Sequence, residues 1–167
     1  MKGSTAAVMI ATIMCLAPVA AQPTGDEAKI RALEENQFAA AVTTKDFDAI
    51  MKVYLPDDTL LVFDVVPPRQ YVGAKAFRKD WEDFLARFKG PLKLEITDLQ
   101  ITAADPLAYS HSIQRVSGTD TNGQPIDLTV RLTRVYRKIY GNWLIVHEHA
   151  SVPVDLNTNK PDLASNP

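Results

Sequence analysis

The chain has 167 residues and a formal net charge of −2, with 18 Lys and Arg against 20 Asp and Glu. This length suits one domain with a substantial hydrophobic core. The basic residues are scattered rather than clustered, so we expect no nucleic-acid partner.

The first 21 residues have the pattern of a cleaved secretory signal peptide. Lys2 precedes an apolar run, Ala6–Ala17, that is too short to span a bilayer. Val19–Ala21 then supplies small residues for cleavage before Gln22. The only cysteine, Cys15, would leave with this segment, so the mature chain would form no disulfide and no cysteine-ligated metal site. We therefore expect a periplasmic or secreted protein with no stable membrane contact after cleavage.

Apolar residues at helical spacing predict three helices in the N-terminal half. The first begins at a Thr24–Glu27 capping box and runs to about Thr43. The second covers 47–54 and ends before Pro56, and the third places the apolar residues of 77–88 on one face.

The remaining pattern is that of strands. One strand over 59–64 and a short return at 71–73 lie between the second and third helices. Alternation after the third helix predicts long antiparallel strands, with a β-bulge near Thr97–Asp98 and a hairpin turn at Asn122–Gly123. These strands cover 92–103, 107–118, 126–139 and 143–154. The pattern predicts an α+β fold with three helices packed on one face of a bent sheet.

Several motifs in this order resemble the nuclear-transport-factor-2-like superfamily, which includes ketosteroid isomerase, scytalone dehydratase and the SnoaL-like cyclases. The resemblance runs from about Asp26 to Asp155 and is most similar to the SnoaL-like branch. The motifs are Phe63–Pro68, Tyr71–Gly73, Gly90–Pro91, Ser117–Thr119 and Gly141–Pro153.

This resemblance implies a cone-shaped roll, in which a strongly curved, mostly antiparallel sheet folds over the helices around a central apolar cavity. It also implies a homodimer that associates through the outer face of the sheet. We expect a signal peptide over 1–21, a domain over 22–155 and a polar, flexible tail over 156–167. The expected partner of the cavity is a small hydrophobic molecule.

Asp64 is the first catalytic candidate. It ends the strand 59–64 and matches the position of the general-base aspartate of ketosteroid isomerase. A carboxyl at the mouth of an apolar cavity has its pKa raised by desolvation, which favours proton transfer near neutral pH. The alternative is a turn-capping Asp that accepts backbone N–H bonds.

His147, His149 and Ser151 recur at period two, so they share one face of a strand. Together with Trp143 and Ile145 they suggest the polar patch of an apolar pocket, with His149 or His147 as the acid that partners the base. Two alternatives stay open: histidines held by backbone or carboxyl partners, and a metal site completed by His111. No further Asp, Glu or His stands at a supporting spacing, so we expect no metal, and no motif indicates a cofactor.

Other candidates would bind the ligand. Arg131 shares a strand face with Thr133 and could bind a carboxylate, or it could lie on a solvated face or in a dimer salt bridge. The tyrosine and neutral aspartic acid that form the isomerase oxyanion hole are not matched in this sequence. The resemblance instead implies Gln37 and Thr133 as groups that could polarise a carbonyl more weakly. Candidate cavity-wall residues are Tyr71, Trp81, Tyr109 and His111.

Three functions are compatible with this reading. The first is a cofactor-independent enzyme of the isomerase, dehydratase or cyclase type, with Asp64 as base. The second is a non-catalytic binder of a small apolar molecule. The third is a dimeric accessory module with a filled cavity.

Overall fold

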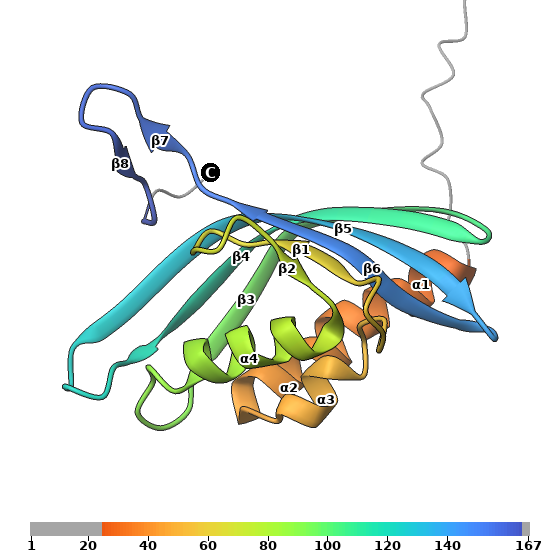
Figure 1. Ribbon diagram of the computed structural model, residues 1–167, viewed down its shortest axis with the longest axis horizontal. Helices are drawn as coiled ribbons and strands as arrows, with labels where there is room; N and C mark the ends of the chain where they lie inside the picture. Colours follow the sequence, from red (N-terminus) through yellow and green to blue (C-terminus); the bar gives the residue numbers. More distant parts are fainter. Residues whose placement is uncertain (1–24, 165–167) are drawn as a thin grey trace, which may run out of the picture.

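The computed structural model describes residues 25–164, so the predicted signal peptide and the capping residue Thr24 lie outside the described residues. Helices lie beneath the concave face of one curved sheet (Figure 1). The predicted α+β cone is confirmed. No helix among residues 25–164 is long and apolar enough to cross a membrane.

The helices follow the predicted order, with two changes in detail. The first predicted helix is a continuous rod whose middle turns are π-helical, and the second ends at Met51, so that Tyr54 instead forms a bridge to Ile145 in the sheet. The helical segments are α1 (Gly25–Ala32), η1 (Leu33–Phe38), α2 (Ala39–Thr44), α3 (Phe47–Met51) and α4 (Ala74–Leu85).

The main sheet has six strands in the order β2-β1-β6-β5-β4-β3. All neighbours are antiparallel except β1 and β6, which run parallel. The strands are β1 (Leu61–Phe63), β2 (Tyr71–Val72), β3 (Lys93–Ala104), β4 (Leu107–Thr119), β5 (Pro125–Ile139) and β6 (Asn142–Ser151). The predicted hairpin at Asn122–Gly123 joins β4 to β5, and Gly123 adopts a positive φ of 84° there.

Two irregularities bend the sheet. In β3 the register shifts between Thr97 and Gln100, and Asp98 has a φ of 52°. This confirms the predicted bulge. A second register shift, between β5 and β6, leaves Val146 as an extra residue between the pairs of Tyr136 with Ile145 and Val135 with His147. Such an extra residue reverses which side chains of the strand face inward.

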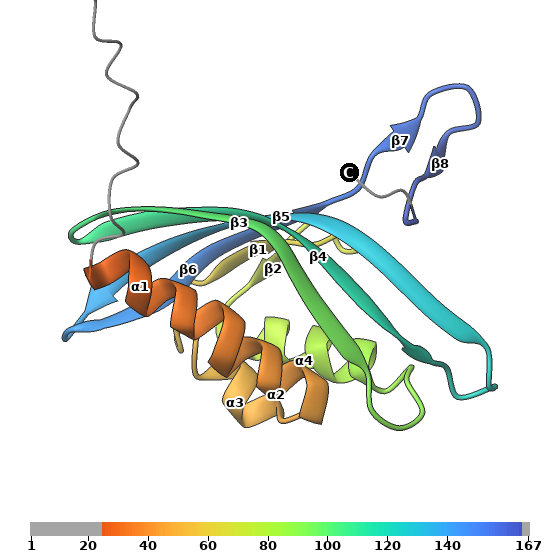
Figure 2. The same ribbon diagram turned by 180° about the vertical axis from the view of Figure 1, so that it is seen from behind.

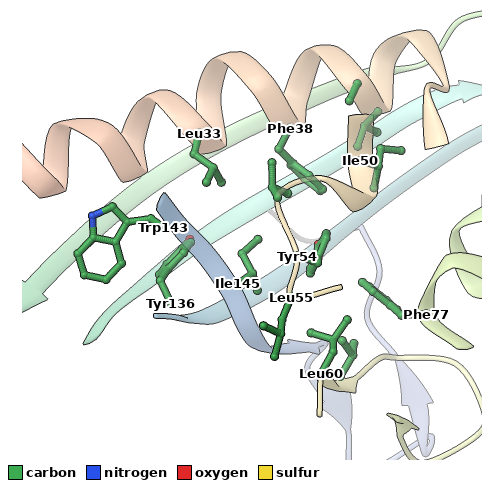
Figure 3. Close-up of a cluster of buried hydrophobic side chains, with 14 of the residues drawn as sticks. Leu33, Phe38, Ile50, Tyr54, Leu55, Leu60, Phe77, Tyr136, Trp143 and Ile145 are labelled. Atoms are coloured by element: carbon green, nitrogen blue, oxygen red, sulfur yellow. The ribbon is translucent and has the colours of Figure 1, made fainter. Parts of the chain in front are cut away.

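The hydrophobic core fills the space between the rod and the sheet (Figure 3). Phe38 from the rod lies beside Tyr54, and Ile145 of β6 packs against the same cluster. Leu60 and Phe77 continue this core toward α4. Phe38 and Phe77 of this core also line the cavity described below.

The C-terminal segment departs from the expected flexible tail. Residues from Val154 to Pro161 form a hairpin of β7 (Val154–Asp155) and β8 (Lys160–Pro161) that stands away from the body (Figures 1 and 2). The chain then returns to the sheet, where the Leu163 carbonyl accepts a hydrogen bond of 2.8 Å from the Thr129 N–H. Part of the predicted tail therefore extends the wall of the cone.

Candidate functional site

A cavity of about 430 Å³ opens between the concave face of the sheet and α4. Its walls are mostly apolar. Val116, Leu128 and Val130 come from the sheet, and Leu163 comes from the returning C-terminal segment. This size and lining are those of a small-molecule site.

Helix α4 presents one face to the cavity. Phe77, Asp80, Trp81 and Phe84 all line it, at the i, i+3, i+4 and i+7 spacing of a single helix face. Trp81 lies edge-on to Phe38, Phe77 and Phe84, with ring centroids 5.7 to 6.1 Å apart. The indole Nε1 is buried and is the one such side-chain atom in the described region with no hydrogen-bond partner.

Asp64 follows β1 directly and lies in the cavity wall, as predicted. Its carboxyl accepts a hydrogen bond of 2.5 Å from the Val65 N–H, so it also caps the turn. Burial raises the pKa of Asp64 to about 7, aided by a hydrogen bond with the Asp80 carboxyl and by the negative charges of Asp80 and Glu148. The Val65 hydrogen bond acts in the opposite direction. Asp64 is therefore a carboxyl whose proton is gained or lost close to neutral pH, with the Asp80 carboxyl beside it.

Tyr71 also lines the cavity, and its hydroxyl donates a hydrogen bond of 3.0 Å to the Pro67 carbonyl. Burial and a hydrogen bond with Asp80 raise the pKa of Tyr71 well above its ordinary value. The phenol is therefore neutral at physiological pH. Tyr71 and Trp81 are the predicted ligand-binding residues that the structure brings to the same cavity as Asp64.

A buried polar network forms the floor of the cavity. The Arg134 guanidinium, only 1% exposed, donates to Glu148 at 2.6 Å, to the Tyr54 hydroxyl at 3.1 Å and to Glu34. The Tyr54 hydroxyl in turn donates to Glu148 at 2.7 Å, and the Tyr136 hydroxyl donates to Glu34. Although burial opposes it, the two carboxylates hold the pKa of Arg134 above its ordinary value. Every charged group of the floor thus has a partner.

Glu34 reaches this network from the π-helical segment η1. The wider turn changes the direction of the side chains around it, and Glu34 is 1% exposed although it stands among the polar residues Glu35, Asn36 and Gln37. Short π-helical turns of this kind occur frequently at functional sites.

The predicted histidines do not face the cavity. Trp143 and Ile145 point into the core, but the extra residue Val146 reverses the alternation, so Glu148 and Ala150 point inward and His149 is exposed. His147 is half-buried on the outer side, where its Nδ1 lies 2.9 Å from the Leu61 carbonyl. The prediction that His147 and His149 share a cavity with Asp64 is therefore wrong.

The other predicted residues of β4 and β5 share this error. Arg131, Thr133, Tyr109 and His111 are all exposed, and none lines the cavity. The inward phase of β5 carries Leu132, Arg134 and Tyr136 instead. His111, Thr133 and His149 are paired across three neighbouring strands, so they form a row on the outer face of the sheet.

Gln37, predicted to bind the ligand, does not line the cavity either. It is exposed and borders a second, more open hollow of about 860 Å³, together with Leu33 and Trp143. In the described part of the chain, no three His, Cys, Asp or Glu residues gather into a metal-binding group.

The sequence contained a signal for the residues that we missed. Arg134 stands at alternate positions with Leu132 and Tyr136, which are apolar or aromatic. A charged side chain in the apolar phase of a strand indicates a buried, paired group. Glu148 could not be found in this way, because the bulge at Val146 changes its phase.

Chemically, the site combines an apolar cavity, a carboxyl, that of Asp64, which can hold or release a proton near neutral pH, and a buried polar floor. Such a carboxyl can act as a general acid or base toward a bound molecule. The described residues of the cavity present no histidine and no cysteine.

Comparisons with known proteins agree with this architecture. The sequence profile of the SnoaL-like domain matches residues 33–155. An NTF2-like protein of unknown function from Pseudomonas putida is 32% identical, with 86% of this chain and 98% of that chain covered and a TM-score of 0.76. No curated protein matches the chain.

Two further solved structures share the fold. An NTF2-like superfamily protein from Salmonella enterica is 18% identical, covering 78% of this chain and 94% of its own, with a TM-score of 0.67. A protein from Streptomyces avermitilis, named provisionally as a dehydratase of the NTF2-like family, is 19% identical, covering 86% of this chain and 100% of its own, with a TM-score of 0.66.

Proposed function

This chain belongs to the SnoaL-like domain family, and we propose that it binds a small, largely apolar molecule in the cone cavity and exchanges a proton with it through Asp64. The observation that carries the proposal is the position of Asp64 in the cavity wall with a pKa of about 7. Both protonation states of such a group are populated at neutral pH, which suits a general acid or base. The name of the Streptomyces avermitilis protein, provisionally a dehydratase, is compatible with this chemistry.

Asp80 supports this role. Its carboxyl shares a hydrogen bond with Asp64, so a proton taken from the ligand by Asp64 can be held between the two oxygens until it is returned. The floor network is not a proton carrier in this account. Arg134, Glu34 and Glu148 fix the shape of the cavity, and the Glu148 charge favours the protonated form of Asp64.

Proton exchange with the solvent tests this proposal without knowledge of the natural substrate. A panel of small cyclic ketones, with and without an amine substituent, is incubated with the protein in D₂O, and proton NMR follows the loss of the C–H signals beside the carbonyl. We expect acceleration for at least one compound. Asp64→Asn should reduce that rate by about 10²–10⁴ while the compound still raises the melting temperature.

The matched control is Asp127→Asn, which makes the same change on an exposed carboxyl bonded to Arg115. It should exchange like wild type. An equal rate in Asp64→Asn and wild type would contradict the role of Asp64. Compounds that raise the melting temperature without any exchange would instead indicate a non-catalytic binder, which the apolar lining of the cavity also favours.

For assembly and location, we propose a homodimer formed through the outer face of the sheet and export to the periplasm or the medium. The exposed Leu107 and Tyr109 support the dimer, because they place large apolar side chains on that face. The signal-like sequence of residues 1–21 supports export.

A further inference from the structure

The charged groups around the cavity are predominantly acidic. Four carboxyl residues line it, namely Asp64, Asp80, Asp83 and Glu148, against the two guanidiniums of Arg87 and Arg134. Asp83 is exposed and paired with Lys79, and Arg87 is exposed just after α4, so water screens both. The groups that remain inside are three carboxyls and one guanidinium.

The one guanidinium inside, that of Arg134, is already paired with carboxylates of the protein. Arg134 bonds two carboxylates, Glu34 and Glu148, and the face of its guanidinium lies 4.1 Å from the centroid of the Phe38 ring. The other groups that bond Glu34 and Glu148 are the hydroxyls of Tyr136 and Tyr54, which are uncharged. Among the described residues, the two carboxylates therefore share a single cation. The floor therefore offers no free positive charge to a carboxylate or phosphate ligand, and it adds negative potential to the cavity.

The walls also favour a positive charge. The rings of Phe38, Tyr71, Phe77, Trp81 and Phe84 all line the cavity. Neighbouring rings meet at steep angles, for example 74° between Phe38 and Trp81 and 79° between Trp81 and Phe84. Aromatic rings attract a cation through the negative part of their quadrupole, which lies on the ring face.

We propose that the molecule bound in this cavity carries a positive charge: an apolar body bearing an ammonium or quaternary ammonium group that lies between the aromatic rings and the carboxyls of Asp64 and Asp80. This inference rests on the proposed function, because it assigns the class of ligand to the same cavity. A cation can gain attraction from both the aromatic rings and the carboxyls of Asp64 and Asp80, whereas an anion of similar size gains neither.

Proton binding should compete with the cation. Asp64 faces Asp80, Tyr71 and Glu148, and it loses its proton as the pH rises through about 7. Ionisation adds a negative charge to the cavity, so the affinity for a permanent cation should rise between pH 6 and pH 8. A neutral molecule of the same shape should show no comparable dependence.

The experiment uses three probes of one size: benzyltrimethylammonium, its uncharged carbon analogue neopentylbenzene, and phenylacetate. Binding to the purified protein is measured by the fluorescence of Trp81 in a Trp143→Phe background, because Trp143 lies outside this cavity. We expect the cation to bind about tenfold or more tightly than the carbon analogue at pH 8, and phenylacetate to bind most weakly.

Variants separate the contributions. Asp64→Asn and Asp80→Asn should each reduce the preference for the cation, and Asp127→Asn, which removes an equal charge from the outer face, should leave it unchanged. Equal affinity for the cation and its carbon analogue would overturn this inference but leave the apolar cavity of the proposed function intact. Preference for phenylacetate would overturn it as well. Failure of all three probes to bind would overturn the proposed function itself.

Discussion

Glu34 and Glu148 share one guanidinium, that of Arg134. The three groups are brought together from η1, β5 and β6, and none is more than 5% exposed. A buried charge that loses its partner keeps its desolvation cost without the compensating attraction. The network therefore connects the helical rod to the sheet through charges that must all be present.

Arg134→Met should lower the free energy of unfolding by about 3–5 kcal/mol, because it leaves two buried carboxyls without their cation. Arg115→Met is the matched control, since Arg115 forms an exposed pair with Asp127 that water screens, so its loss should cost far less. Urea denaturation measures both values. Equal losses in the two variants would show that the buried network has no special weight.

The raised pKa of Asp64 predicts how the free energy of unfolding depends on pH. Its pKa is raised from 3.8 to about 7 in the folded state, so between these values the folded chain binds more protons than the unfolded chain. Its contribution is thus fully present below about pH 4 and is lost as the pH rises through about 7. Relative to Asp64→Asn, wild type should lose on the order of 4 kcal/mol between pH 4 and pH 8, since raising the pKa from 3.8 to about 7 corresponds to this free energy. A difference that stays constant over this range would contradict the raised pKa.

Asp64, Tyr71 and Trp81 were predicted at the cavity, Asp64 because the resemblance to ketosteroid isomerase implies a carboxyl at the end of this strand. The sequence did not predict Asp80 as the partner of Asp64. That pairing joins α4 to the end of β1, and no local pattern relates positions in two elements that meet only in the folded chain.

Among the elements, the two bulges show where pattern reasoning holds and where it fails. In β3 the apolar positions change phase between Ile96 and Leu99, so the bulge is visible in the sequence and was predicted. In β6 the extra residue is Val146, which lies among apolar and aromatic residues whose two faces look alike. The phase of that strand was therefore misread, and His147 and His149 were assigned to the wrong face.

The β3 bulge predicts how substitutions at Asp98 change the free energy of unfolding. Asp98 adopts a φ of 52°, a left-handed conformation that a β-branched residue tolerates poorly. Asp98→Val should reduce the free energy of unfolding by about 1–2 kcal/mol, whereas Asp98→Gly should be close to neutral. Thermal unfolding of the two variants measures the difference. Equal stability would argue against strain at this position.

For the whole molecule, the fold was predictable because several motifs in a fixed order resemble one superfamily.

The proposed homodimer leads to a prediction about the mass of the particle in solution. Light scattering on the mature chain should report twice the monomer mass. Tyr109→Arg should produce monomers, because it places a charge among exposed apolar residues of the outer face.

Tyr140→Arg is the control for that substitution. Tyr140 is fully exposed on the turn between β5 and β6, away from the sheet face, and its replacement should leave the mass unchanged. A wild-type monomer at micromolar concentration would overturn the proposed dimer, and a dimer that survives Tyr109→Arg would place the interface elsewhere.

We infer that the cavity of this SnoaL-like protein contains an aspartic acid that exchanges protons near neutral pH. Titration of the Asp64 side-chain carboxyl by ¹³C NMR, assigned with Asp64→Asn, measures this property at the residue itself. We expect a midpoint near pH 7 that moves to lower pH in Asp80→Asn, because this substitution removes a neighbouring negative charge. A midpoint near 4, the ordinary value for an aspartic acid, would contradict it.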